Sequence, residues 1–307
     1  MKKTFFSVII PTFNRAGLLE KALRSIMNQT FSDWECIIVD DGSTDNTGAF
    51  MQDWIRKDAR FRYIYQENTE RSAARNNGIK NSNGMYICFL DSDDYYLPNR
   101  LNNFYEYLVE NKYPVALIFS GILFENNGSF SEREVQITPT IKEKIFDYLT
   151  LTIIGTPQIC VSSEVLSEFQ FDIRFRFSED LELCFRVAHK YPILPQPYNL
   201  TVVALDHDNR TVGYKYFNTS KEQMKTWRYI FDKDHSGKFI SRKTKNRQYG
   251  YLLFNEAKYY MFNNKKFKAT YFIIKSLLFD PFNKFNKHRL YCLFSIFAFK
   301  IPIEYSK

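Results

Sequence analysis

The sequence predicts an α/β protein with a mostly parallel, doubly wound sheet and a helical C-terminal region. Short apolar runs rich in β-branched residues alternate with helical periods over residues 1–120, and strands that alternate with helices form parallel sheets. After residue 120 this alternation stops, and from residue 214 onward only helical periods remain. The 307 residues are enough for one domain of about 200–250 residues and an appendage.

The first 120 residues contain five strand-like runs separated by helical periods. Pro11 ends the first run, and the apolar residues of the first helical period all fall on one face. Ser43 or Thr44 is expected to cap the second helix. The expected strands are Phe5–Ile10, Trp34–Val39, Phe61–Tyr65, Tyr86–Leu90 and Val115–Phe119, and the expected helices are Leu18–Met27, Thr47–Arg56, Ser72–Lys80 and Pro98–Val109.

Residues 121–213 have a different pattern. Asn126-Asn127-Gly128 is a hairpin turn signal, because Asn and Gly adopt the positive φ angles that tight hairpin turns need. The runs Ile122–Phe124 and Glu134–Ile137 flank this turn. Further on, the pattern predicts helices over Ile141–Leu149 and Leu181–His189 and a strand over Leu200–Leu205.

Charge is distributed unevenly along the chain, whose formal net charge is +8. Residues 1–214 carry 22 Lys and Arg against 28 Asp and Glu, whereas residues 215–307 carry 20 against 6. The C-terminal region therefore has a net charge of +14 and is expected either to face an anionic partner or to present a solvated, lysine-rich helical surface.

The cysteines and the hydropathy pattern predict a cytoplasmic location. None of the five cysteines has metal-ligand spacing and four lie in apolar runs, as expected of small buried hydrophobes in a reducing compartment. The apolar stretch at the N-terminus is too short for a signal peptide. No run approaches the roughly 20 apolar residues that span a bilayer, since the nearest, Leu290 to Phe299, is about half as long.

Two acidic motifs follow strand-like runs. The first contains Asp40 and Asp41, and the second contains Asp91 and Asp93. Because ligands of open sheets bind outside the carboxyl ends of the strands, these carboxylates are expected to face a ligand. Two carboxylates one residue apart on a tight turn suit a divalent cation that also holds phosphate oxygens. The motifs thus predict a protein that binds a nucleoside diphosphate with a metal.

Taken together, the motifs resemble those of the family 2 glycosyltransferases, which have the GT-A (nucleotide-diphospho-sugar transferase) fold. The resemblance covers about residues 5–210, and it is specific because five pieces occur in the family's order. These pieces are Val8–Arg15, Val39–Asp45, Ala73–Gly78, Phe89–Asp94 and the acceptor-side segments Phe171-Asp172 and Ser178–Leu183.

The resemblance implies a nucleoside-diphosphate sugar as donor, most commonly a UDP-sugar, and a divalent cation, Mn²⁺ or Mg²⁺. Asp93 matches the family's main metal ligand, and Asp91 matches the first carboxylate, which contacts the donor's ribose or the metal through water. His207 is similar to a histidine that serves relatives as a third metal ligand or a phosphate contact, although no Tyr-Arg precedes it here.

Further donor contacts follow from the same resemblance. Asp41 matches the carboxylate that accepts a hydrogen bond from the donor's base, and Asp40 is the alternative. Arginine forks suit phosphate oxygens. The other donor-binding residues implied are Pro11, Thr12, Asn14, Arg15, Arg75, Asp91 and Ser92.

The acceptor hydroxyl must lose a proton as it attacks, and a carboxylate within hydrogen-bond reach can take it. Asp180 matches the family's catalytic base, with Glu179 as the alternative. Adjacent residues of a helix point about 100° apart, so only one of the two is expected to face the pocket. A base opposite the leaving group implies inversion at the anomeric carbon.

The predicted organisation is a catalytic domain over residues 1–213 and a basic, aromatic helical region over residues 214–307. Within the first, residues 1–120 form the nucleotide-binding half and residues 121–213 the acceptor side. Apolar runs flanked by Lys and Arg favour contact of the C-terminal region with an anionic membrane, peripherally on its inner face. In the alternative, this region packs on the catalytic domain or on a second copy as a homodimer. Nucleic-acid binding is not expected, because no recognised module is present.

The resulting function is that of an inverting, metal-dependent hexosyl- or N-acetylhexosaminyltransferase acting on a glycan or lipid-linked glycan in cell-surface polysaccharide biosynthesis. One alternative is a sugar nucleotidylyltransferase. That class needs a Gly-rich, basic phosphate loop after the first strand. Residues 11–17 contain a single glycine, which argues against it. The other is a non-catalytic module that binds sugar nucleotides or glycans, against which the intact Asp91, Asp93 and Asp180 argue.

Overall fold

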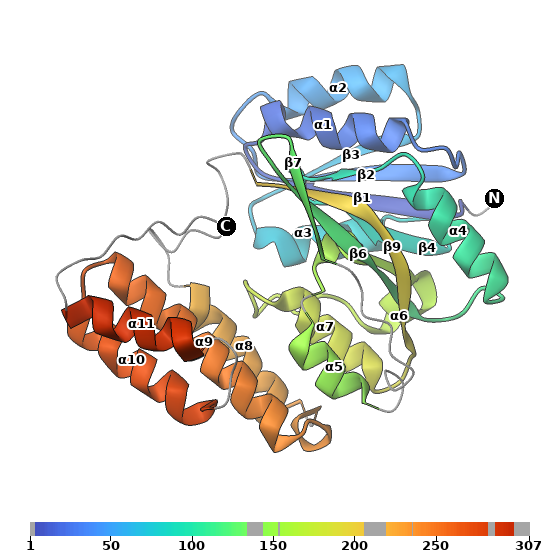
Figure 1. Cartoon of the computed structure of the whole chain (residues 1–307). Coiled ribbons are helices and arrows are strands. Elements are labelled where there is room, and N and C mark those ends of the chain that lie inside the picture. Colours follow the sequence, from blue (N-terminus) through green and yellow to red (C-terminus); the bar gives the residue numbers. More distant parts are fainter. Residues whose placement is uncertain are drawn as a thin grey trace. The chain divides into compact units, whose positions relative to one another are not determined.

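The structure of the chain is a computed structural model, described here for residues 4–133, 144–152, 154–205, 219–234, 236–281 and 286–297 (Figure 1). It contains two compact units, of which the first comprises residues 1–145 and 153–208. The second unit, residues 146–152 and 209–307, is described separately below.

The first unit is built on one twisted sheet, which has nine strands among the described residues in the order β3-β2-β1-β4-β8-β6-β9-β5, with β7 paired to β6. The half made of β3, β2, β1 and β4 is parallel throughout, as predicted. The strands are β1 (Phe6–Thr12), β2 (Trp34–Asp41), β3 (Phe61–Gln66), β4 (Tyr86–Phe89), β5 (Tyr95–Tyr96), β6 (Leu117–Asn126), β7 (Ser129–Arg133), β8 (Ile159–Ser162) and β9 (Ile193–Ala204).

The second half of the sheet is mixed, which the sequence pattern did not predict. Strand β8 runs antiparallel to both β4 and β6, whereas β6 and β9 are parallel. The predicted strands Val115–Phe119 and Ile122–Phe124 form one strand, β6. The predicted hairpin turn is confirmed, since Asn126 pairs with Ser129 across it. The expected strand Glu134–Ile137 lies outside the described residues.

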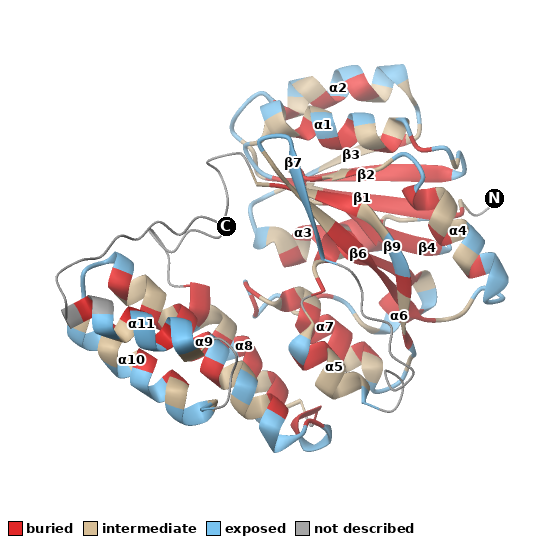
Figure 2. Cartoon of the chain, in the orientation of Figure 1, coloured by how far each residue is buried: buried red, intermediate tan, exposed pale blue. Residues whose placement is uncertain are grey.

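Helices cover both faces of this sheet (Figure 1). Val8 and Ile10 of β1 belong to the cluster that α1, α2 and α4 cover, whereas Ile9 points to the other face and meets α3. Strands β2 and β4 are buried along their whole length (Figure 2). The helices of this unit are α1 (Ala16–Met27), α2 (Thr47–Lys57), α3 (Glu70–Lys80), α4 (Arg100–Glu110), α6 (Ser163–Glu168) and α7 (Glu179–Ala188), with a 3₁₀ turn, η1, over Thr156–Gln158.

The predicted N-cap of α2 is wrong. The N-cap is Asn46, whose side chain makes no capping hydrogen bond, and neither Ser43 nor Thr44 has this position. Instead the Asp45 carboxylate accepts hydrogen bonds from the Thr47 backbone N–H, at 3.0 Å, and from the Thr47 hydroxyl, at 2.5 Å. Ser43 and Thr44 bond to the loop after β1 instead, as described below.

Gly78 fixes the distance between α3 and the sheet. A Cβ at this position would lie 2.5 Å from Cγ2 of Ile9, which is buried in β1. We therefore expect Gly78→Ala to lower the free energy of unfolding in urea by about 1–3 kcal/mol, because overpacking strains a close-packed interior. Gly17 in α1 is the matched control, since nothing lies within 4 Å of its Cβ position and Gly17→Ala should stabilise by about 0.5–1 kcal/mol. Equal stability of the two variants would contradict this packing argument.

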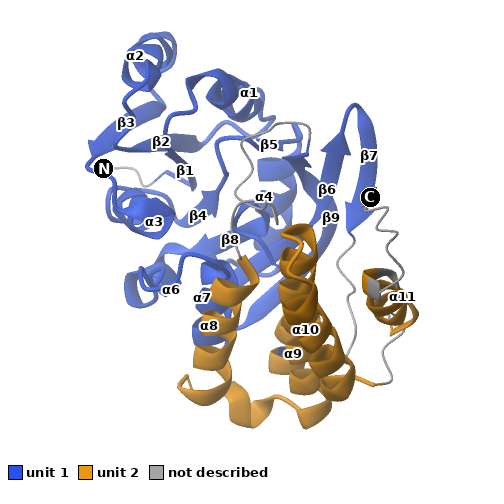
Figure 3. Ribbon diagram, turned by 90° about the vertical axis from the view of Figure 1, so that its left-hand side faces the viewer, with its two compact units in different colours: residues 1–145, 153–208 blue, residues 146–152, 209–307 orange. Residues whose placement is uncertain are grey.

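The second unit is helical, as expected for the C-terminal region (Figure 3). Its core joins Phe254, Ala257 and Met261 of α9 to residues of α10 and α11. Helix α5 belongs to this unit, because Phe146 stacks on Phe239 at 5.2 Å between ring centroids. The elements are α5 (Ile145–Leu151), α8 (Thr219–Asp232), α9 (Arg242–Phe262), α10 (Lys266–Phe279) and α11 (Asn286–Phe297), with a 3₁₀ turn, η2, over Ser236–Phe239.

The boundary predicted after residue 213 falls among residues that the structure does not describe, so it stays a prediction. Among the described residues, no helix is both long and apolar enough to cross a bilayer.

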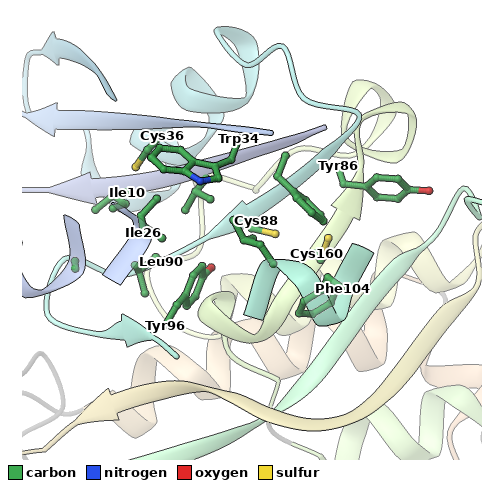
Figure 4. Packing of buried hydrophobic residues seen from close by; sticks show 14 of the residues in the cluster. Ile10, Ile26, Trp34, Cys36, Tyr86, Cys88, Leu90, Tyr96, Phe104 and Cys160 are labelled. Atoms are coloured by element: carbon green, nitrogen blue, oxygen red, sulfur yellow. The ribbon is translucent and has the colours of Figure 1, made fainter. Parts of the chain in front are cut away.

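All five cysteines are buried with free thiols, as the sequence predicted. Cys88 and Cys160 lie opposite each other on the paired strands β4 and β8, and Tyr96 and Phe104 of the same core are drawn below Cys88 (Figure 4). Cys36, Cys88 and Cys160 are part of the main hydrophobic core, so they act as small apolar side chains there.

Candidate active site

The two acidic motifs meet at one edge of the sheet. Strand β1 lies between β2 and β4 and is parallel to both, so the carboxyl ends of all three strands point the same way. Thr12 pairs with Asp40 in register, and Leu90 donates its backbone N–H to the Ile9 carbonyl at 3.0 Å. The loop after β1 therefore lies beside both motifs, as the ligand site of an open α/β sheet requires.

Asp40 and Asp41 are both buried but have different partners. The Asp40 carboxylate accepts from the Ser43 backbone N–H at 2.8 Å and from the Tyr63 hydroxyl at 2.6 Å, one bond to each oxygen. Burial and this hydrogen bond raise the pKa of Tyr63. Asp41 Oδ1 accepts from the Thr69 backbone N–H at 2.9 Å and from Gln66 Nε2 at 2.7 Å. Both oxygens of Asp40 thus already accept hydrogen bonds, one from the turn and one from β3, which favours Asp41 as the carboxylate that faces a ligand.

Asn14 joins the loop after β1 to the loop after β2. Its side-chain oxygen accepts from the Thr44 backbone N–H at 2.8 Å, and its own backbone N–H donates to the Ser43 hydroxyl at 2.8 Å. Asn14 has a φ of 51°, a value that Asn tolerates better than most residues. The sequence predicted Asn14 as a ligand contact, and the structure adds a role in positioning the loop. Nearby, the Thr12 hydroxyl is buried and has no hydrogen-bond partner among the described residues.

The second motif forms a tight turn, as predicted, which the Asp94 backbone N–H closes by donating to the Asp91 carbonyl at 3.0 Å. Arg15 reaches across from the loop after β1 and forms an ion pair with Asp93 at 2.8 Å. The same nitrogen of Arg15 lies 3.5 Å from the Ser92 hydroxyl. Three of the predicted donor-binding and metal-binding side chains are therefore in contact.

Arg75 connects the second motif to the predicted catalytic pair. One terminal nitrogen of its guanidinium donates to Asp91 Oδ1 and the other to Glu179 Oε1, each at 2.8 Å. The guanidinium is 1% exposed and lies 5.4 Å from the centre of the Phe171 ring. Burial lowers the pKa of Arg75, but the carboxylates of Asp91 and then Glu179 outweigh it and raise that pKa overall. Phosphate binding by Arg75 stays a prediction, because the side chain already holds two carboxylates.

Asp180 is the second member of the pair at the start of α7. Burial, followed by the charge of Glu179, raises the pKa of Asp180 to about 7, against the opposing effects of the Leu181 backbone N–H and Arg75. The Leu181 backbone N–H donates to Asp180 Oδ1 at 2.8 Å. Ser178, just before the pair, has a φ of 59°, so the chain bends sharply into the helix. The Glu179 carboxylate is thus paired with the Arg75 guanidinium. The pKa of Asp180, at about 7, suits a general base near neutral pH.

The predicted metal ligands are only partly accounted for. His207 lies outside the described residues. Among the described residues, no group of three or more His, Cys, Asp or Glu side chains converges as a metal site. Asp91 and Asp93 are two hard oxygen donors on one turn, and Mg²⁺ is usually held by one or two carboxylates with substrate phosphates and water. The residues present therefore fit a cation that the donor's phosphates help to hold.

Paired carboxylates at the carboxyl edge of a parallel half-sheet, with an aspartate of raised pKa beside them, are the arrangement expected of an α/β enzyme that binds its ligand at this edge. The family description "Glycosyl transferase family 2" matches residues 7–168. The chain belongs to this family, and the resemblance found in its sequence is confirmed.

Curated relatives agree with this assignment. Glycosyltransferase GlyA of Streptococcus pneumoniae is 35% identical over 150 residues, which are 47% of this chain and 20% of GlyA. The GalNAc(5)-diNAcBac-PP-undecaprenol beta-1,3-glucosyltransferase of Campylobacter jejuni is 38% identical over 41% of this chain and 40% of its own length. The putative teichuronic acid biosynthesis glycosyltransferase TuaG of Bacillus subtilis is 32% identical over 57% of this chain and 69% of TuaG. The matched part of the chain thus spans less than half of the length of the first two of these relatives.

Solved structures confirm the predicted GT-A fold. Residues 1–349 of Staphylococcus aureus TarS in complex with UDP-GlcNAc have a TM-score of 0.61 and 14% identity, over 97% of this chain and 93% of that one. The mannosyltransferase PcManGT of Pyrobaculum calidifontis, in complex with GDP-Man and Mn²⁺, has a TM-score of 0.59 and 17% identity, over 97% and 81% of the two chains.

Proposed function

We propose that this glycosyltransferase is inverting and metal-dependent, and that it moves a sugar from a nucleoside diphosphate to a hydroxyl of a glycan or lipid-linked glycan in cell-surface polysaccharide biosynthesis. The observation that carries the proposal is the bridge through Arg75, with 2.8 Å contacts to Asp91 on the donor side and to Glu179 on the acceptor side. Asp180, adjacent to Glu179, has its pKa raised to about 7. Arg75 thus links a carboxylate on the proposed donor side, Asp91, to the acidic pair on the proposed acceptor side, Glu179 and Asp180.

On the donor side, Asp91 and Asp93 would hold the divalent cation, which when bound neutralises charge on the departing diphosphate. Arg15 pairs with Asp93 at 2.8 Å and is positioned to turn to a phosphate oxygen. Asp41 is oriented by Thr69 and Gln66 to accept a hydrogen bond from the base. Pro11, Thr12, Asn14 and Ser92 complete the donor-binding set that we propose.

On the acceptor side, Asp180 takes the proton of the attacking hydroxyl. A base with a pKa of about 7 is partly ionised at neutral pH and strong enough to accept the proton as the new bond forms. Because Asp180 acts from the side opposite the leaving diphosphate, the transferred sugar inverts at its anomeric carbon.

The names of related proteins support the substrate classes. The Campylobacter relative acts on an undecaprenol-linked glycan, and the solved neighbours bind UDP-GlcNAc, or GDP-Man with Mn²⁺. A hexosyl or N-acetylhexosaminyl group, carried by UDP in the first instance, is the donor that we propose. A lipid-linked glycan is the acceptor, and Mn²⁺ or Mg²⁺ is the cation.

A binding and turnover panel tests the function. The full chain is first screened by thermal shift against UDP-, GDP- and TDP-sugars with Mn²⁺, and the best binder is then assayed for nucleoside-diphosphate release with glycan acceptors. We expect release that depends on the cation, and a product whose anomeric proton shows inverted configuration by NMR. Pyrophosphate release from a nucleoside triphosphate and a sugar 1-phosphate would instead identify a nucleotidylyltransferase. Tight binding without turnover on any acceptor would favour a non-catalytic module.

A further inference from the structure

Helix α10 has an exposed apolar face, which we call the apolar stripe: Phe267, Tyr271, Ile274 and Leu278. Their exposed fractions are 93%, 51%, 45% and 75%. The spacing of i, i+4, i+7 and i+11 places all four side chains in one line along the helix. Single exposed apolar residues are ordinary, but four aligned over three turns form a patch that indicates an interaction site.

The apolar stripe is not the face by which α10 packs in its own unit. Ala269, Ile273 and Ser276 are the buried residues of α10, and the first two lie in the core that α9 and α11 share. Among the described residues, α10 therefore has one apolar face that is buried and a second that is exposed. The exposed apolar face is not needed for packing in the core, so it indicates contact with a second apolar environment.

Helix α11 repeats the arrangement. Cys292 and Ile296 face the shared core, whereas Leu290, Tyr291 and Phe294 are exposed, Phe294 by 69%. Lys287 is also exposed and lies one turn before Tyr291. Two neighbouring helices thus each present Tyr, Phe or Leu outward with lysine beside them.

Charge identifies the partner of these faces. Lys268 and Lys275 flank the apolar stripe, and Lys275 Nζ lies 4.6 Å from the centre of the Tyr271 ring. Residues 265–297 contain six Lys and one Arg but a single acid, Asp280. An anionic bilayer offers an apolar boundary for the aromatic and leucine side chains and negative headgroups for the lysines. Lysine suits this arrangement because its stem covers apolar surface while its amine reaches the headgroups.

Other occupants fit less well. A second copy would place two basic faces of the same sign against each other, since a two-fold interface pairs like patches. Nucleic acid would satisfy the lysines but would leave Phe267 and Leu278 in water. A spanning orientation is too short, because the 14 residues of α10 extend about 21 Å against a hydrocarbon core of about 30 Å.

We propose that α10 and α11 dock flat on an anionic membrane surface through the apolar stripe and its flanking lysines. This inference rests on the second unit alone and does not depend on the proposed catalytic function, so lipid binding and activity can fail separately.

Flotation of the full chain with vesicles tests the proposal. The vesicles contain phosphatidylcholine alone or with phosphatidylglycerol, and no acceptor or donor is added. We expect binding to the anionic vesicles, weak binding to the neutral ones and release at about 1 M salt, where the Debye length falls to about 3 Å. Equal binding to both vesicle types, or binding to neither, would overturn the proposal.

Paired variants separate the two contributions. Phe267→Ser with Leu278→Ser should weaken vesicle binding at least about tenfold, since both side chains would leave the lipid boundary. Lys268→Glu with Lys275→Glu should weaken binding to anionic vesicles by a similar factor or more. Because all four side chains are exposed, the variants should unfold at the wild-type temperature. The matched controls are Phe130→Ser, on an exposed hairpin of the first unit, and Lys57→Glu with Lys80→Glu, all of which should bind as wild type.

Two results would point to other partners and overturn the proposal. The first is a homodimer, seen by analytical ultracentrifugation without lipid, that the Phe267→Ser and Leu278→Ser pair dissociates while vesicle binding is unchanged. The second is binding to duplex DNA or RNA that the lysine variants abolish, combined with no preference for anionic vesicles.

Discussion

Asp180→Asn should lower the rate of sugar transfer by roughly 10²–10⁴, with donor affinity almost unchanged. The substitution keeps the shape of the side chain and removes its ability to take a proton. Transfer rates from single-turnover experiments and donor affinity from calorimetry are the two measurements. If Glu179→Gln abolishes transfer while Asp180→Asn is mild, the assignment within the pair is wrong.

The pH dependence of the transfer rate gives a second test of the role of Asp180. Because burial and Glu179 raise the pKa of Asp180 to about 7, the carboxylate form increases as the pH rises through that value. The wild-type transfer rate should therefore rise with pH around 7, and this dependence should be lost in Asp180→Asn.

Stability provides the control. A carboxyl group whose pKa is raised in the folded state binds a proton more tightly there than in the unfolded state, so its ionisation disfavours folding as the pH rises through the raised pKa. Asp180→Asn should consequently unfold at or above the wild-type temperature at pH 8. A lower unfolding temperature would mean that lost activity reflects lost structure.

Asp93→Ala should abolish cation-supported donor binding and reduce turnover at least about 100-fold, because stabilisation of a leaving diphosphate by a cation contributes several kcal/mol. Donor affinity is measured by calorimetry with and without Mn²⁺, and turnover with and without EDTA. Asp53→Ala is the matched control, since Asp53 also pairs with an arginine, Arg56, but lies on the exposed side of α2. Full wild-type activity in EDTA would contradict the metal dependence.

The parallel half of the sheet was predictable because its strands and helices are each local patterns. Apolar runs such as Trp34–Val39 and one-faced periods such as Leu18–Met27 carry their own signal, and the structure has strands and helices at these places. Strand β8, Ile159–Ser162, was not predicted, although it is as long as the predicted strand β4. Its position between β4 and β6 depends on pairing with segments far away in sequence.

In the candidate site, too, features that follow from local sequence were predictable and long-range contacts were not. The carboxylates of both motifs were identified from the sequence because each motif lies at the carboxyl end of a strand-like run, and the structure has strands β2 and β4 there. The partners of Arg75 were not, since Asp91 is 16 residues away and Glu179 is 104 residues away. Tyr63 likewise meets Asp40 only because β2 and β3 pair in the sheet. Side-chain pairs of this kind depend on tertiary structure, and no local pattern encodes them.

The Arg75 bridge affects how substitutions in the second motif are to be interpreted. Removing the Asp91 carboxylate leaves a buried guanidinium with Glu179 as its remaining close partner, and loss of one partner from a buried ion pair is strongly destabilising. The effect of an Asp91 variant therefore combines a missing metal ligand with a misplaced acceptor pair. For the same reason, substitutions at Asp91 and Glu179 act on one shared network and their effects are non-additive. Asp93, whose ion pair is with the partly exposed Arg15, reports on the cation more directly.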